Sequence, residues 1–182
     1  MRHVLSFILL MFLNGLSQAA HWKQQDDSTL GFSGSAQGEA FDGQFKQFTA
    51  DIRFGPEDIG NARFDVRIRL DSVDSANSER DDTLRSADFF NVAAKPEARY
   101  VAEDFERSDG GFIANGKLTL NGKTADVPLR FQFKVSDSSA TLDGEATLNR
   151  LDFNVGGGDW ADPSMIDTAV TVSTHLELKA SQ

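Results

Sequence analysis

Residues 62–71 read Ala62-Arg63-Phe64-Asp65-Val66-Arg67-Ile68-Arg69-Leu70-Asp71, and apolar and polar side chains alternate along the whole stretch. Successive side chains of a β-strand point to opposite faces, so this alternation gives one apolar face and one polar face. The apolar face would carry Phe64, Val66 and Ile68. The stretch is therefore predicted to be a half-buried strand of an antiparallel sheet.

The same period of two recurs on both sides of this strand. The other alternating segments are residues 30–35, 41–54, 98–105, 112–120, 127–135, 140–148 and 170–178. Within residues 41–54 the apolar parity changes between Phe45 and Phe48, which predicts a β-bulge that keeps the apolar face inward. Asn121-Gly122 is the strongest hairpin signal of the chain. The pattern predicts consecutive strands that are paired with their neighbours in the sequence.

Eight such strands with mostly short connections predict an all-β fold. Eight antiparallel strands are about the number that closes a barrel wide enough for side chains or one small ligand. Closure also removes the exposed edges of a sheet. We therefore expect one eight-stranded antiparallel barrel, and a two-sheet sandwich is the alternative because the same alternation permits it.

One segment, residues 77–90, breaks the alternation and carries helix signals. Ser78 offers a hydroxyl for the N-cap, and acidic residues follow it in the first turn. Asp81 and Arg85 have the spacing and order of a favourable surface ion pair. We expect one short helix within residues 78–87 that covers one end of the barrel.

The N-terminal segment has the pattern of an export signal. One basic residue precedes an apolar run over residues 4–13, and small residues follow up to Ala19, as in secretory signal peptides. Cleavage is expected after Ala19, with Ala20 as the alternative, so that residues 1–19 form the signal peptide and residues 20–182 the domain. The apolar run is shorter than the roughly 20 residues that span a bilayer, which argues against a membrane anchor, and no later segment is apolar enough.

The composition excludes several classes of function. The net charge of the chain is −10, and removal of residues 1–19 takes away one basic residue, Arg2, so that the charge becomes −11. A chain this acidic is repelled by nucleic acid and by anionic lipid surfaces. The absence of cysteine excludes disulfides, thiolate nucleophiles and iron–sulfur clusters. Only His21 and His175 remain after processing, so neither a metal nor another cofactor is expected.

No group of residues has the pattern of a catalytic site. Gly156-Gly157-Gly158 lacks the Lys-Ser/Thr pair of a phosphate loop and is interpreted as a turn. Serine hydrolysis needs a positioned base, and neither histidine lies in a recognisable motif. The 28 acidic residues include no pair that spacing alone can select as acid and base. We therefore expect no catalytic residues and a protein that is not an enzyme.

The apolar strand faces and the covering helix favour a ligand container instead. Phe dominates the aromatic residues, with 15 Phe against 2 Trp and 1 Tyr, and it supplies apolar area without a polar group. The residues expected to line an apolar tunnel are Phe41, Phe64, Val66, Ile68, Phe89, Phe90, Phe112, Leu118, Phe131 and Phe133. Ordinary core packing is the alternative, above all for Phe89 and Phe90 beneath the helix.

The helical segment also carries polar residues beside this apolar set. We expect Asn77, Arg80 and Arg85 to contact the polar headgroup of the ligand. The alternative is that each arginine pairs with a neighbouring acid on the surface, such as Asp82 or Asp88.

Five segments of the chain carry a family resemblance. They are Trp22-Lys23, residues 43–50, residues 77–90, residues 116–124 and residues 149–153. In this order they resemble the YceI-like, polyisoprenoid-binding protein family, and the resemblance covers residues 22–179. It implies an extended lipocalin-like, eight-stranded barrel that holds a long isoprenoid chain in a narrow apolar tunnel. Together with the export signal, it implies a periplasmic protein that carries or sequesters such a lipid. The alternatives are an exported enzyme that acts on the lipid and a barrel that binds a protein partner through its acidic surface.

Residues 148–162, Leu-Asn-Arg-Leu-Asp-Phe-Asn-Val-Gly-Gly-Gly-Asp-Trp-Ala-Asp, are similar to one branch of that family. This branch is found with cytochrome b561-type membrane domains. The similarity implies an isoprenoid quinone as the ligand, in preference to an isoprenyl phosphate, and a membrane cytochrome b561-type protein as a partner.

Overall fold

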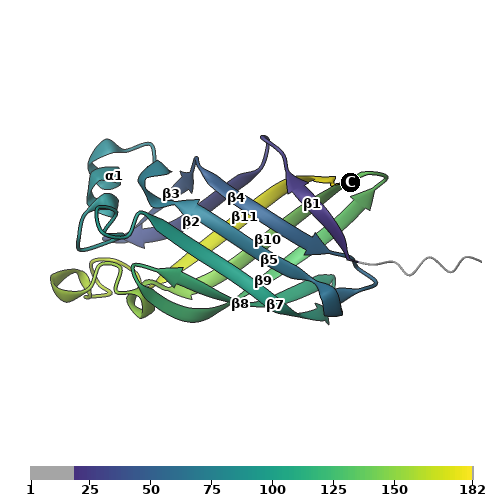
Figure 1. Ribbon diagram of the computed structural model, residues 1–182. Coiled ribbons are helices and arrows are strands. Elements are labelled where there is room, and N and C mark those ends of the chain that lie inside the picture. The colour runs from purple at the N-terminus through teal and green to yellow at the C-terminus, as the bar shows by residue number, and fades with distance from the viewer. Residues whose placement is uncertain (1–18, 182) are drawn as a thin grey trace, which may run out of the picture.

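Every strand of the sheet is antiparallel to its neighbours, and the sheet closes on itself where the first strand meets the last (Figure 1). The computed structural model describes residues 19–181, so the expected signal peptide, apart from Ala19, lies outside the described residues. The strands are β1 Ala20–Gln24, β2 Thr29–Ala36, β3 Glu39–Phe45, β4 Phe48–Phe54, β5 Arg63–Arg69, β6 Val73–Asp74, β7 Glu97–Ser108, β8 Gly111–Leu120, β9 Lys123–Ser136, β10 Ser139–Asn149 and β11 Ala169–Ala180. The helix α1 spans Ser78–Arg85, and short 3-10 helices span Ile59–Asn61, Leu70–Ser72, Arg150–Phe153 and Gly158–Trp160.

Three of the eight positions in the ring are each occupied by two shorter strands, and two of these strands, β1 and β6, lie outside the predicted segments. β1 and β2 both pair antiparallel with β11. β4 pairs with β1, and β3 pairs with β2. On the next position, β5 pairs with β4 and β6 pairs with β3. The break between β3 and β4 falls where the parity change predicted a bulge, and Phe45 and Phe48 on its two sides both face the interior. With each of these positions counted as one strand, the ring has eight strands in meander order, as predicted, and it is a barrel and not a sandwich.

The Asn121-Gly122 hairpin is also confirmed. Both residues have positive φ, 48° for Asn121 and 75° for Gly122, which is the conformation of a two-residue type I′ turn. The turn joins β8 to β9, and the ladder runs from Leu120 opposite Lys123 to Phe112 opposite Phe131.

The helix forms where it was expected, but two details of the expectation were wrong. The N-cap is Asn77 and not Ser78, because the Asn77 side chain accepts a hydrogen bond from the Arg80 backbone N–H at 3.0 Å. Asp81 does not pair with Arg85: it is buried and accepts hydrogen bonds from the Ser75 backbone N–H at 2.8 Å and the Ser75 hydroxyl at 2.6 Å. The helix is therefore tied to the barrel by its acidic first turn. No helix within residues 19–181 has the length and apolarity needed to cross a membrane.

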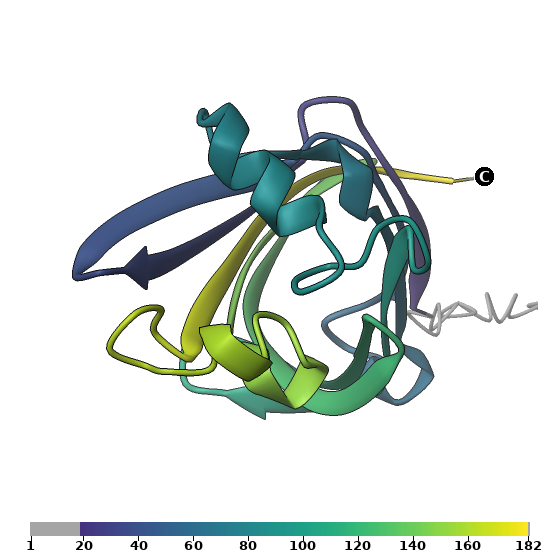
Figure 2. The same cartoon turned by 90° about the vertical axis from the view of Figure 1, so that its left-hand side faces the viewer.

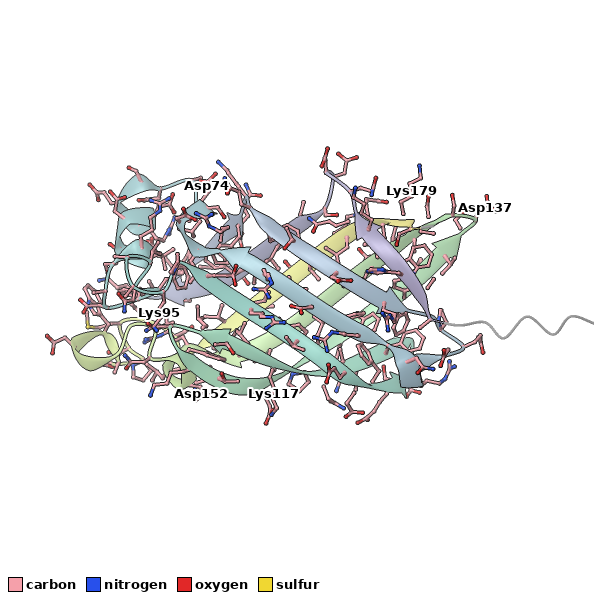
Figure 3. The ribbon with its side chains drawn as sticks, in the orientation of Figure 1. Asp74, Lys95, Lys117, Asp137, Asp152 and Lys179 are labelled. Atoms are coloured by element: carbon pink, nitrogen blue, oxygen red, sulfur yellow. The ribbon has the colours of Figure 1, made fainter. Side chains whose placement is uncertain are left out.

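The outer surface of the barrel carries most of the charged side chains, with Asp81 and Arg150 as buried exceptions. Figure 3 places Asp74, Lys95 and Asp152 at the end where α1 lies, and Asp137 and Lys179 at the opposite end. Figure 2 looks onto the α1 end and shows the helix and residues 150–168 at the rim of the barrel.

His175 lies on this outer surface, with two carboxylates beside it. Its Nδ1 is 2.6 Å from Asp143 Oδ1 and its Nε2 is 3.1 Å from Glu177 Oε1. The hydrogen bond with Asp143 raises the pKa of His175 above its ordinary value of 6.5. Because the pKa is raised in the folded protein, the pair stabilises the fold below about pH 6.5, where His175 is charged in both the folded and the unfolded protein. This contribution is lost as the pH rises through the folded-state pKa.

We therefore expect wild-type protein to exceed the His175→Gln variant in unfolding free energy at pH 5.5, by at most about 1 kcal/mol because the pair is half-exposed. The difference should shrink as the pH is raised to 8.5. Urea denaturation of both proteins across this range measures it. A difference that is the same at both ends of the range would contradict the assignment.

Candidate functional site

The interior of the barrel contains one solid half and one hollow half. The solid half is an aromatic plug of six rings, Phe54, Phe64, Phe105, Phe112, Phe131 and Phe133. Beyond Phe64 lies a cavity of about 190 Å³ that reaches the α1 end, where Phe89, Phe90 and Arg150 are part of its wall. Its wall is almost entirely apolar, as a site for a hydrocarbon chain requires.

The cavity brings together seven of the ten residues that the sequence placed in a tunnel. They are Phe41, Phe64, Val66, Ile68, Phe89, Phe90 and Leu118. Their contact with a ligand stays a prediction. Phe89 and Phe90 are buried in a packed cluster, as the core-packing alternative expected, and they also form part of the cavity wall.

The other three predicted residues lie elsewhere. Phe112, Phe131 and Phe133 belong to the aromatic plug and are not part of the cavity wall. Phe112 and Phe131 are opposite each other on β8 and β9, and their rings stack at 5.5 Å. All three side chains do point inward, but at the end of the barrel away from α1, where other rings already fill the interior.

Several wall residues come from strands that the sequence analysis left out of the tunnel. β10 and β11 contribute Leu142, Ala146, Leu148, Val170, Val172 and Leu176. Their alternation already indicated that they face inward, and this signal was sufficient to include them.

Tyr100 is a polar group in the cavity wall and lies between the two halves of the interior. It packs against both apolar clusters, and its hydroxyl donates a hydrogen bond to the Ala114 carbonyl at 3.1 Å. Burial raises the pKa of Tyr100, so the phenol is neutral at physiological pH. The ring lies across Gly116, where an added Cβ would come within 2.2 Å of it. Because Gly116 has no side chain, the Tyr100 ring can lie over the backbone of β8 at this residue.

Arg150 is a buried cation at the α1 end and was not predicted as a site residue. It is 3% exposed, and its guanidinium donates five hydrogen bonds. The acceptors are the backbone carbonyls of Val155, Gly156, Trp160, Ile166 and Asp167. None of these acceptors is a carboxylate, and desolvation lowers the pKa of Arg150. The side chain therefore holds residues 150–168 in place as part of the cavity wall.

Gly156 makes room for this arrangement. Its φ is 61°, and a Cβ at this position would lie 2.8 Å from Arg150 Nη1 and 3.0 Å from the Phe89 ring. The Gly156 N–H donates to the Asp88 carbonyl at 2.8 Å, which links the loop to the segment after α1. The glycine segment that was interpreted as a turn therefore also connects residues 150–168 to the segment that follows α1.

The three residues predicted to contact a headgroup are all engaged with the protein. Asn77 caps α1, and Arg85 donates to the carbonyls of Asp71 and Val73 and to Asp82. Arg80 donates to Ser75, and its guanidinium lies 4.7 Å above the ring of Phe41.

The alternative of pairing with a nearby acid holds for Arg85. Arg80 contacts the outside of the cavity wall, because Phe41, beneath its guanidinium, is a wall residue. A headgroup contact for any of the three predicted residues stays a prediction. Within residues 19–181, no three His, Asp or Glu side chains are grouped as a metal site would require.

Comparison with known proteins gives one family over nearly the whole chain. The model of the YceI-like domain matches residues 22–178. Protein YceI of Escherichia coli is 30% identical over 167 residues, which is 83% of this chain and 84% of that protein. Two other curated relatives, 34% and 37% identical over 87 residues, are matched over about half of their length (45%).

Solved structures have the same fold. BcnA of Burkholderia cenocepacia is 26% identical and has a TM-score of 0.79 over 82% of this chain and 95% of BcnA. A polyisoprenoid binding domain of Saccharophagus degradans is 17% identical and has a TM-score of 0.67 over 90% of this chain and 99% of that domain.

Proposed function

The chain belongs to the YceI-like domain family, and we propose that it binds the apolar tail of an isoprenoid lipid in the barrel cavity and carries or sequesters the lipid without altering it. The observation that carries this proposal is the apolar cavity that ends at Phe64 and reaches the α1 end. The name of the structural neighbour from Saccharophagus degradans, a polyisoprenoid binding domain, supports the same class of ligand.

The hydrophobic effect supplies most, but not all, of the free energy for such binding. Burial of apolar surface yields about 25 cal/mol per Å², so a tail that buries about 300 Å² gains roughly 7 kcal/mol before losses. The restriction of the tail and of the protein offsets part of this gain. An affinity in the micromolar range, about −8 kcal/mol, is therefore reached only with additional contacts at the rim.

The rim favours a lipid with a neutral headgroup, such as an isoprenoid quinone. The guanidinium of Arg150 is occupied by five backbone carbonyls, and Arg85 is occupied by two carbonyls and Asp82. A phosphate would thus meet few free donors on an acidic protein. The similarity of residues 148–162 to domains found with cytochrome b561 adds a membrane cytochrome of this type as the proposed partner.

We also propose that the protein is exported to the periplasm. Cleavage after Ala19 leaves β1 whole, whereas cleavage after Ala20 removes the residue that pairs with Phe54. The intact mass of the protein recovered from the periplasm distinguishes the two sites. Recovery of uncleaved protein from the cytoplasm alone would contradict the proposal.

Mass spectrometry of lipid extracted from the purified protein tests the function. We expect wild-type protein, equilibrated with membranes that contain isoprenoid quinones and isoprenyl phosphates, to retain an isoprenoid and to prefer the quinone. The Ala146→Trp variant places a large ring in the cavity and should retain less lipid, on the order of tenfold less.

The matched control is Thr147→Trp, which adds the same side chain at the next residue on the outer face. It should retain as much lipid as wild type. Equal retention by both Trp variants, or an empty wild-type protein, would contradict the proposal. Conversion of the retained lipid during incubation would indicate an enzyme instead.

A further inference from the structure

The inward-facing residues of the barrel strands differ in type between the α1 end and the far end of the barrel. On β4, β7 and β9, residues that face the cavity are followed toward the far end by Phe54, Phe105 and Phe131. Toward α1 the inward positions of β5, β8, β9, β10 and β11 carry mostly aliphatic residues, such as Val66, Val127 and Ala146, whereas β2, β3 and β4 keep Phe32, Phe41, Phe45 and Phe48 in the wall. The interior is therefore filled by rings at the far end and contains the cavity at the α1 end.

Phe64 is the floor of the cavity. It is the residue that belongs both to the cavity wall and to the aromatic plug. Its ring lies 4.8 Å from Phe105 and 5.2 Å from Phe131, and it is 1% exposed. A chain that enters from the α1 end meets this ring and, behind it, the rings of the plug.

The depth of the cavity follows from the strands that form its wall. On β10 the wall runs from Leu142 to Leu148 and on β11 from Leu176 to Val170, seven residues and thus six residue-to-residue steps in each case. A strand rises about 3.3 Å per residue, which gives about 20 Å along the strand. A strand tilt of about 40° reduces this to about 15 Å along the barrel axis.

This depth corresponds to a short hydrocarbon segment. An extended chain advances about 1.2 Å per backbone bond, so about 15 Å takes roughly a dozen bonds, or about three isoprene units. Any further units have no apolar wall to contact, because the plug leaves them outside the cavity.

We propose that the aromatic plug, whose residue Phe64 forms the floor of the cavity, limits the length of isoprenoid chain that the cavity buries to about three units. The inference rests on the proposed function and adds a specificity to it. Shorter chains leave part of the wall uncovered, and longer chains extend past the rim. The protein thus selects by the roughly three isoprene units that enter the cavity and not by the total length of the tail.

Calorimetric titration with prenols of increasing length tests the limit, from geraniol through farnesol and geranylgeraniol to longer chains. For wild-type protein we expect the affinity to rise on the order of tenfold per added unit up to about three units and less than twofold per unit thereafter. The Phe64→Ala variant lowers the floor, so its affinity should continue to rise for about one more unit. The Val66→Phe variant raises the floor, because Val66 is the next inward residue on β5, and its plateau should come about one unit earlier.

Val66→Phe fills existing space, so it keeps the test valid if Phe64→Ala fails to fold. Leu178→Ala is the control: it removes packing from the same apolar cluster at a residue outside the cavity wall, and its plateau should match wild type. Prenol binding with an unchanged plateau in both floor variants would overturn the inference alone. Failure of wild type to bind a prenol of any length would overturn the proposed function on which it rests.

Discussion

Replacing Arg150 with Met is expected to lower the free energy of unfolding by on the order of 3 kcal/mol. The substitution introduces a long apolar side chain in place of the arginine and removes all five N–H donors. The carbonyls of Val155, Gly156, Trp160, Ile166 and Asp167 then lose their shared partner. A buried carbonyl without a donor costs about 1–3 kcal/mol, so the loop should open to water and not keep all five buried.

Hydrogen exchange locates this effect and chemical denaturation gives its size. The amide protons of residues 150–168 should exchange faster in the variant, while those of β8 and β9 keep the wild-type order of protection. Arg150→Lys should not restore the loop, because one ammonium group has three donors and cannot replace a planar group with five.

The control for the Arg150 variant is Arg130→Met, which removes an exposed arginine from the outer face of β9. It should change stability by less than about 0.5 kcal/mol. Unchanged exchange in residues 150–168 of the Arg150→Met variant would show that the loop does not depend on this side chain.

The alternation of residues 62–71 and its repeats was sufficient to predict the barrel. A period of two reports which face of a strand is buried, and closure of eight such strands follows from the need to cover their edges. The same signal identified Phe45 and Phe48 as inward on both sides of an interruption. These features are local, so one sequence suffices to read them.

The level of a residue inside the barrel is not a local property. Parity placed Phe112, Phe131 and Phe133 inward, but it carries no information on which end of the barrel each occupies. That depends on the register of each strand pair, such as Phe112 opposite Phe131. A one-residue change in register would alter the levels of the residues on a strand, and the hydrophobic pattern alone does not set the tilt. The sequence therefore could not show that these three residues lie outside the cavity wall.

Arg150 escaped prediction for a related reason. Its five acceptors are backbone carbonyls between residues 155 and 167, and backbone groups leave no mark in a sequence. Asp81 shows the same limit on a smaller scale. Its spacing to Arg85 suits an ion pair, yet the neighbouring Ser75 supplies two donors that enclose it.

The plug itself should be the most stable part of the molecule, and Phe54 is at its centre. The ring is fully buried and lies 4.8–5.9 Å from the rings of Phe64, Phe105, Phe112, Phe131 and Phe133. The Trp22 indole N–H also donates to the Phe54 carbonyl at 2.8 Å. Truncation to Ala leaves a void that five rings cannot all move to fill. We therefore expect Phe54→Ala to lose about 3–5 kcal/mol of unfolding free energy.

Phe48→Ala is a matched control on the same strand, because Phe48 borders the cavity and already lacks packing partners on one side. The same truncation there should cost less, about 1–2 kcal/mol, since fewer contacts are lost. Guanidinium denaturation of the two variants measures the difference. If the two losses are equal, the far half of the barrel is no better packed than the cavity. Chains longer than about three isoprene units would then find room beyond Phe64. A loss at least twice as large for Phe54→Ala indicates a plug that resists displacement, as a fixed limit on chain length requires.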